Sequence, residues 1–274
     1  MSATAPPETT ATAEVLVARA RPVYTRVAVL GLLLAAAAPL TYFVAGAVAG
    51  SLDEGTFFLV TAGVALLGAA LVWAFGSWSK VVGIVVSLLI AMALFWTVFG
   101  LAYPASLVDF VPGVLLPLGV ALGIGGNVAA LVSKRRGRLA SAATGAERRI
   151  VGIVLAVAGL AVVVSGALTL AGQESLQTAG AARATLADFA FDGPYEASAG
   201  EPTTFVVHNS DPVVHTFTVK ELGVNEQVLP GSDARVDFTA PPGTYTVYCI
   251  PHSSGPGADT SPDSDEMATT LVVR

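Results

Sequence analysis

A chain of 274 residues that is 54% hydrophobic and 12% charged, with a mean hydropathy of +0.70, carries about half the charge of an ordinary soluble protein. These totals exclude a wholly soluble globular protein. The formal net charge of −6 is unevenly divided, with +3 on residues 1–182 and −9 on residues 183–274. An acidic C-terminal part is repelled by nucleic acid and by anionic lipid, so we expect no nucleic-acid partner.

The first 26 residues are rich in Ala, Thr, Pro and Glu, which predicts a disordered tail. Apolar stretches follow, each about 20 residues long, the length that crosses a bilayer as an α-helix. We therefore predict an α-helical membrane bundle over residues 27–171. Its five expected transmembrane helices are residues 27–50, 56–75, 81–103, 110–132 and 150–171.

The Lys and Arg residues of this half set its orientation. All of them lie in the N-terminal flank and in the second and fourth loops, and the first and third loops have none. Basic residues mark cytoplasmic loops, so we predict a multi-pass protein of the cell (plasma) membrane with a cytoplasmic N-terminus and an extracytoplasmic C-terminal domain. A signal peptide cleaved near Ala49 is the alternative for the first span, although the apolar run is longer than in such peptides.

The predicted spans contain no ionisable side chain away from their edges, so we expect no proton relay, ion path or haem site in them. Gly152, Gly159 and Gly166 form a stripe along the fifth span, and small residues on one face let helices approach closely. We favour packing within the chain, and a docking face for another membrane subunit is the alternative.

Residues 172–182 are small and polar, which predicts a short linker. From Ala184 the apolar pattern alternates, and turn signals such as Pro241-Pro242-Gly243 separate short runs. This pattern predicts an all-β sandwich over residues 183–274. The expected strands are residues 184–191, 202–208, 214–220, 226–229, 234–239, 244–250 and 270–273.

Cys249 is the only cysteine, and we place it outside the cytoplasm, where paired cysteines form disulfides. Without a partner in this chain it is buried and inert, linked to another chain, or a metal ligand. The spacing Cys249-x-x-His252 favours a metal, because a thiolate at a strand end and an imidazole in the next turn can converge on one ion. His215 and Met267 complete a Cys-His-His-Met set, which suits a copper ion that alternates between Cu(I) and Cu(II).

The sequence around these residues resembles the cupredoxins, the plastocyanin-like blue copper proteins. The matching text is Asn209 with His215-Thr216-Phe217, the run from Pro242 to His252, and Met267 before Leu271-Val272-Val273. The resemblance covers residues 183–274 and implies an antiparallel Greek-key sandwich with one type 1 copper ion per chain. It also implies that His215, Cys249 and His252 are the equatorial ligands and Met267 the axial ligand.

One departure from typical cupredoxins is the longer segment of residues 253–266 between His252 and Met267. Either it loops out and leaves the axial geometry intact, or it leaves Met267 too mobile to bind. Beside the ligands, we expect Thr216 to help hold the copper-binding loops through its side chain. His208 alternates with Val207 in a strand, and we expect it to face solvent.

These features predict a membrane-anchored electron carrier that works with a redox partner protein such as a cytochrome, an oxidase or a reductase. The resemblance implies that His252 lies nearest the surface and serves as the electron port. No substrate pocket or catalytic base is implied, so we do not expect an enzyme. Capture or delivery of copper without redox cycling is the alternative, and a membrane assembly subunit with a docking domain of this fold is a third hypothesis.

Overall fold

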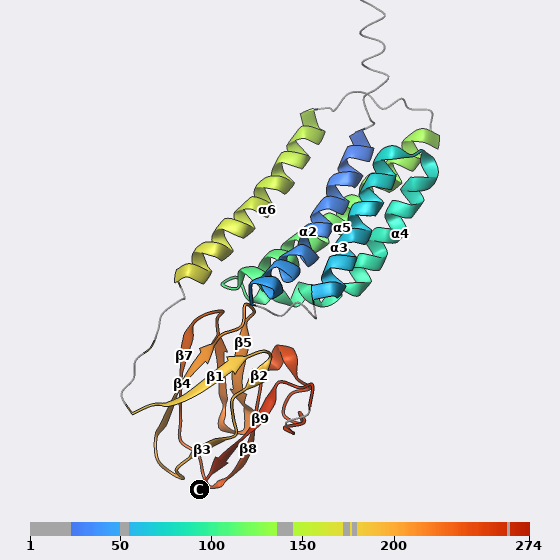
Figure 1. The fold of residues 1–274 in the computed structure, drawn as a ribbon. Helices are drawn as coiled ribbons and strands as arrows, with labels where there is room; N and C mark the ends of the chain where they lie inside the picture. The colour runs from blue at the N-terminus through green and yellow to red at the C-terminus, as the bar shows by residue number, and fades with distance from the viewer. Residues whose placement is uncertain (1–22, 50–54, 136–144, 172–175, 177–179, 262–263) are drawn as a thin grey trace, which may run out of the picture. The chain divides into compact units, whose positions relative to one another are not determined.

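A computed structural model of the chain describes residues 23–49, 55–135, 145–171, 176, 180–261 and 264–274 (Figure 1). Most of the predicted tail and linker, and parts of the first and fourth loops, lie outside the described residues. The described residues form a helical region followed by a β domain, as the composition predicts. Residues 23–26, which we assigned to the tail, form the first turn of the first described helix.

The helical region contains five α-helices and one long 3₁₀-helix among its described residues. Four helices are long and apolar enough to cross a membrane, and α4 with η1 makes a fifth span if this bent pair is counted as one. The bounds are α2 Val23–Ala49, α3 Gly55–Ala74, α4 Ser77–Ala93, η1 Phe95–Ala102, α5 Leu107–Arg135 and α6 Gly145–Ala171.

The third predicted span, residues 81–103, differs from expectation because it is not one straight helix. α4 ends at Ala93, and η1 continues at an angle of 56°. Neither proline nor glycine lies at the break, so no residue there signals the bend in the sequence.

Two glycines show how α2 and α5 pack closely. A Cβ atom on Gly31 would lie 2.2 Å from the backbone nitrogen of Gly123, and one on Gly119 would lie 2.5 Å from that of Ala35. Only hydrogen fits at such contacts, which is the usual reason for small residues between membrane helices. The stripe on α6 is different, because no described atom lies within 4 Å of a Cβ built on Gly152 or Gly159. A Cβ built on Gly166, in contrast, would lie 3.6 Å from Cδ1 of Leu107, so among the described residues the packing that we favoured for the stripe is seen only at Gly166.

The β domain is a sandwich of two sheets, and its alternating apolar residues face each other between them. One sheet has the order β2-β1-β4-β7 and the other the order β3-β9-β8-β5-β6. The strands are β1 Ala182–Ala187, β2 Ala190–Phe191, β3 Tyr195–Ala197, β4 Thr203–Asn209, β5 His215–Val219, β6 Val224–Val228, β7 Asp233–Phe238, β8 Gly243–Tyr248 and β9 Ala268–Val273.

Two features differ from the predicted sandwich. The expected first strand, residues 184–191, is a hairpin of β1 and β2 around Asp188 and Phe189, and the short β3 was not expected. The sheets are also not purely antiparallel, because β1 pairs with β4, and β3 with β9, in parallel. Each parallel pair joins strands that are far apart in the sequence, so no tight hairpin dictates their direction.

Phe217 lies at the centre of the core, fully buried and in ring contact with Phe191, Tyr195 and Phe205. We expect Phe217→Ala to lower the free energy of unfolding of this domain by about 3–5 kcal/mol, because it leaves a large cavity. Labelling of Cys249 by a thiol reagent in increasing urea measures this loss, since the only cysteine is buried here.

The matched control is Glu196→Gln, which removes an exposed ion pair with Arg274 and should change the free energy of unfolding by less than about 0.5 kcal/mol. A loss below about 1 kcal/mol for Phe217→Ala would contradict the central place of this ring in the core.

Candidate metal centre

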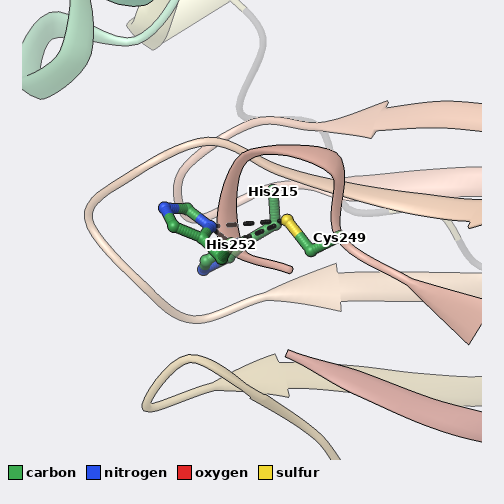
Figure 2. Close-up of side chains that lie close together, drawn as sticks. All are labelled: His215, Cys249 and His252. Carbon is green, nitrogen blue, oxygen red and sulfur yellow. Dashed lines mark hydrogen bonds between the residues drawn. The ribbon is translucent and has the colours of Figure 1, made fainter. Parts of the chain in front are cut away.

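Three polar side chains meet at one end of the sandwich (Figure 2). His215 begins β5, Cys249 directly follows β8, and His252 ends the short 3₁₀-helix η3, Ile250–His252. The Sγ atom of Cys249 lies 3.5 Å from Nδ1 of His215 and 3.4 Å from Nδ1 of His252. The two Nδ1 atoms are 3.1 Å apart. Two nitrogens and a sulfur thus form a small triangle.

The size of this triangle can be compared with what a metal ion needs. Nitrogen and sulfur donors bind first-row ions at about 2.0–2.3 Å, so three donors spread evenly around one ion stand about 3.5–4.0 Å apart. The observed separations of 3.1–3.5 Å are slightly shorter, and a movement of a few tenths of an ångström opens the triangle to that size. Imidazole nitrogen with thiolate sulfur is a donor set that suits copper, so the residues fit such an ion.

Burial keeps Cys249 and His252 uncharged at neutral pH in the absence of a metal. Burial raises the pKa of the Cys249 thiol to about 11, against the opposing effect of the Thr216 N–H, which lies 3.3 Å from the sulfur. Burial, and then the charge of His215, lower the pKa of His252 to about 4. His252 therefore presents a neutral ring at neutral pH, and Cys249 has to release a proton to bind a metal as a thiolate.

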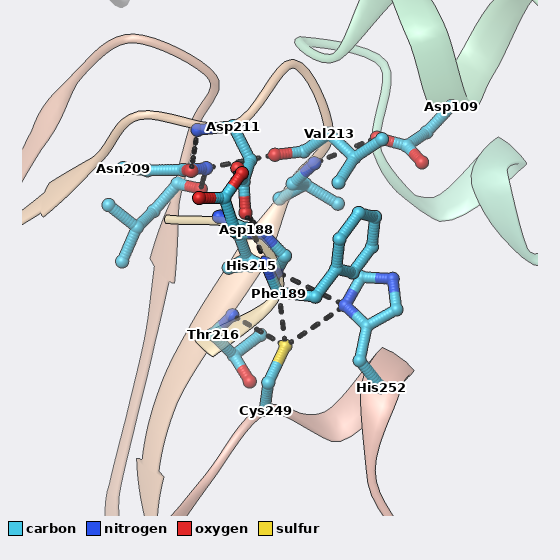
Figure 3. A network of polar contacts seen from close by, with 12 residues as sticks. Asp109, Asp188, Phe189, Asn209, Asp211, Val213, His215, Thr216, Cys249 and His252 are labelled. Atoms are coloured by element: carbon cyan, nitrogen blue, oxygen red, sulfur yellow. Dashed lines mark hydrogen bonds and ion pairs between the residues drawn. The ribbon is translucent and has the colours of Figure 1, made fainter. Parts of the chain in front are cut away.

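Asp211 fixes the orientation of His215 (Figure 3). Its Oδ2 atom lies 2.8 Å from Nε2 of His215, and both side chains are buried. Burial raises the pKa of Asp211, but hydrogen bonds from His215 and from the backbone of Phe189 and Asp188 outweigh it and hold the pKa below its usual value. An ionised carboxylate only accepts, so Nε2 of His215 donates to it, and Nδ1 is the nitrogen that faces Cys249 and His252.

Asn209 shapes the loop that carries Asp211. Its side-chain NH₂ group donates to the carbonyls of Val213 and Val228, at 2.8 and 2.9 Å, and its Oδ1 accepts the backbone N–H of Asp211 at 2.9 Å. Asn209 is completely buried, and each of these groups has a partner. The loop between β4 and β5 is therefore fixed from within, and this fixes the direction of the Asp211 carboxylate.

Thr216 links β5 to the segment that follows β8. Its hydroxyl oxygen accepts the backbone N–H of Ile250 at 2.9 Å, while its own backbone N–H points to the sulfur of Cys249. This is the holding role that the sequence predicted for Thr216.

Met267 is buried beside the triangle, and its backbone position is set by two hydrogen bonds. Its N–H donates to the carbonyl of His252 at 3.0 Å, and its carbonyl accepts the N–H of Cys249 at 3.0 Å. The preceding segment is also anchored, because the Glu266 carboxylate accepts the N–H of Asp259 and the hydroxyl of Ser254. The chain therefore returns at Met267 to the backbone of Cys249 and His252.

His208 lies apart from this group. Its ring is 43% exposed and pairs with Asp233 at 2.7 Å, in keeping with the expected solvent-facing position. Sequence reasoning missed Asp211, which lies between two of the predicted strands, and Phe189, which it placed in the first predicted strand. The spacing of Asp211 four residues before His215 was an available signal, whereas nothing in the sequence marks Phe189 as a neighbour of the histidines.

Comparison with known proteins supports the fold. The family model of the cupredoxin-like domain matches residues 161–258, a range that includes the three residues of the triangle and ends before Met267. No curated protein matches the sequence.

Three solved structures illustrate the similarity. The periplasmic domain of cytochrome oxidase subunit II of Bradyrhizobium japonicum is 15% identical over 36% of this chain and 86% of that chain, with a TM-score of 0.26. A chain of a heme-copper terminal oxidase dimer is 16% identical over 46% and 95%, with a TM-score of 0.26. A purple cupredoxin from Nitrosopumilus maritimus is 16% identical over 34% and 99%, with a TM-score of 0.24.

Likenesses as remote as these do not bear on activity or partners. The family model and the β domain agree on the fold of the C-terminal part. The chain thus carries a cupredoxin-like domain, matched over residues 161–258, after a region of helices apolar enough to span a membrane.

Proposed function

We propose that the chain is a membrane-anchored type 1 copper protein that carries single electrons between redox partners at the outer face of the membrane. The observation that carries this proposal is the triangle of His215, Cys249 and His252, with donor atoms 3.1–3.5 Å apart in a buried site of a cupredoxin-like domain. Copper bound by these residues and by Met267 would supply the change between Cu(I) and Cu(II). We propose no catalytic reaction for the chain.

The protein residues would serve electron transfer in two ways. His215 and Cys249 are completely buried and fixed by Asp211 and Thr216, so the donors need little movement when the charge changes. His252 is only partly buried, which supports its assignment as the ligand that exchanges electrons with a partner. The net charge of −9 on residues 183–274 would steer that domain toward a partner with a basic patch.

Addition of Cu(II) to the full chain should produce an intense blue or green absorption band with one copper bound per chain. The band should disappear in Cys249→Ser, because charge transfer from the thiolate to copper is its source, and should persist in the control His208→Ala, which lies outside the triangle. A colourless copper-loaded protein would contradict the proposal. Tight Cu(I) binding with slow electron exchange would instead indicate copper delivery.

We expect Met267→Leu to keep the colour and to raise the reduction potential. Loss of a thioether removes a donor that stabilises the higher charge of Cu(II), and the axial ligand tunes the potential of such sites. Redox titration of the copper-loaded protein measures the change, with Leu271→Ile, in the core part of the strand that follows Met267, as the control. An unchanged potential in Met267→Leu would show that Met267 is not a ligand.

The proposal also places the N-terminus in the cytoplasm and the β domain outside. Protease added to cells whose cytoplasmic membrane is intact and accessible should remove an epitope tag placed after Arg274. The same tag placed before Met1 should survive until the membrane is opened. Protection of the C-terminal tag in closed cells would reverse the orientation derived from the basic loops.

A further inference from the structure

The hairpin of β1 and β2 has an unusual residue at its tip. Ala187 pairs with Ala190, so the loop consists of Asp188 and Phe189 alone, with φ angles of 53° and 57°. Two-residue hairpins with positive φ at both positions favour Asn or Asp followed by Gly. Phe189 occupies the position where glycine is preferred, and a bulky residue there is strained. Backbone strain of this kind is retained at functional sites when the side chain has a use.

The Phe189 ring lies against both histidines of the triangle (Figure 3). Its centroid is 5.0 Å from that of His252 and 5.5 Å from that of His215, with interplanar angles of 88° and 85°. These are edge-to-face contacts, an arrangement that aromatic rings favour. Phe189 is 39% exposed, so part of this residue is open to solvent while its ring contacts both imidazoles.

Asp211 connects this ring to His215. Its carboxylate accepts the backbone N–H of Asp188 at 2.8 Å and that of Phe189 at 3.0 Å, in addition to the bond with His215. Both amides of the strained loop are thus held by one buried side chain that also orients a candidate ligand. The position of the Phe189 ring is coupled to the position of His215.

We propose that Phe189, held by Asp211, shields the metal centre and keeps water and small external ligands such as azide away from its histidine side. Asp211 acts as a positioning residue in this arrangement. The role of the shield rests on the proposed copper function, but its existence can be tested without copper, because Cys249 is the only thiol and lies behind the histidines.

The test measures the rate at which N-ethylmaleimide labels Cys249 in the metal-free full chain in detergent. In Phe189→Gly the rate should rise about tenfold, the factor expected for the loss of two aromatic contacts. The thermal midpoint should stay the same or rise, because glycine relieves the strained loop. Phe189→Tyr keeps the ring and should label at the wild-type rate.

Asp211→Asn should also raise the labelling rate. The side-chain NH₂ group would face another donor, either the Nε2–H of His215 or a backbone N–H of the loop, and would lose a hydrogen bond that the carboxylate makes. The double variant Phe189→Gly/Asp211→Asn should label no faster than the faster single variant, since the two residues act as one unit. Asp233→Asn is the matched control: it breaks a carboxylate–imidazole pair with His208 of similar length, outside the triangle, and should leave the rate unchanged.

Three outcomes would each overturn the shield. The first is a labelling rate in Phe189→Gly within about twofold of wild type, and the second is additive effects in the double variant. The third is a labelling rate that follows thermal stability across all variants.

In the copper-loaded chain, azide should bind Phe189→Gly about tenfold more tightly than wild type, measured from the visible spectrum. A chain that binds no copper but shows the expected labelling rates would overturn the proposed function alone. A coloured copper protein with unchanged rates and unchanged azide affinity would overturn the shield alone.

Discussion

One buried carboxylate joins three parts of the β domain. Asp211 accepts the Nε2–H of His215 and the backbone N–H groups of Asp188 and Phe189. Because this bond orients the ring of His215, it also settles that Nδ1 is the nitrogen that faces Cys249 and His252. An unsatisfied amide in such a place destabilises by about 1–3 kcal/mol, so the loop, the ring and the ligand hold their positions together. The geometry of the candidate centre depends on this interaction more than on any other single contact.

The sandwich supplies the rigid frame that this interaction needs. β5 carries His215 and β8 leads into Cys249, and Thr216 links the two through its hydroxyl. Behind them lies an apolar core in which Phe217 is completely buried. Close packing of such a core resists displacement of the strands, so the donor triangle is formed before any ion enters. A preformed site of this kind changes little when the charge of a bound ion changes, which is the physical requirement for fast electron transfer.

The sequence predicted those parts that depend on local pattern. The apolar runs predicted helices long enough to cross a membrane, and alternation with turn signals predicted a sandwich; the structure has both, apart from the bend between α4 and η1. The gathering of His215, Cys249 and His252 followed from residue type, spacing and resemblance, because few other combinations use a single thiol beside two histidines. The hairpin at Asp188 and Phe189 was not predicted, since positive φ at a phenylalanine contradicts local preference. It is stabilised by Asp211, more than twenty residues away, and no periodicity in the sequence reveals a bond over that distance.

Electron transfer and copper delivery, the two functions considered for this domain, differ in how accessible the centre has to be. A protein that delivers copper has to let an incoming ligand reach the ion and replace its own ligands one by one. In this chain Cys249 and His215 are completely buried, Asp211 fixes His215, and Phe189 covers the side where both imidazoles would be approached. If the triangle holds copper as proposed, each of these features would slow ligand replacement, while none would hinder an electron that leaves through the partly buried ring of His252. Burial and anchoring of the donors therefore support the proposed electron carrier over the alternative of a delivery protein, and this support does not depend on the identity of the partner.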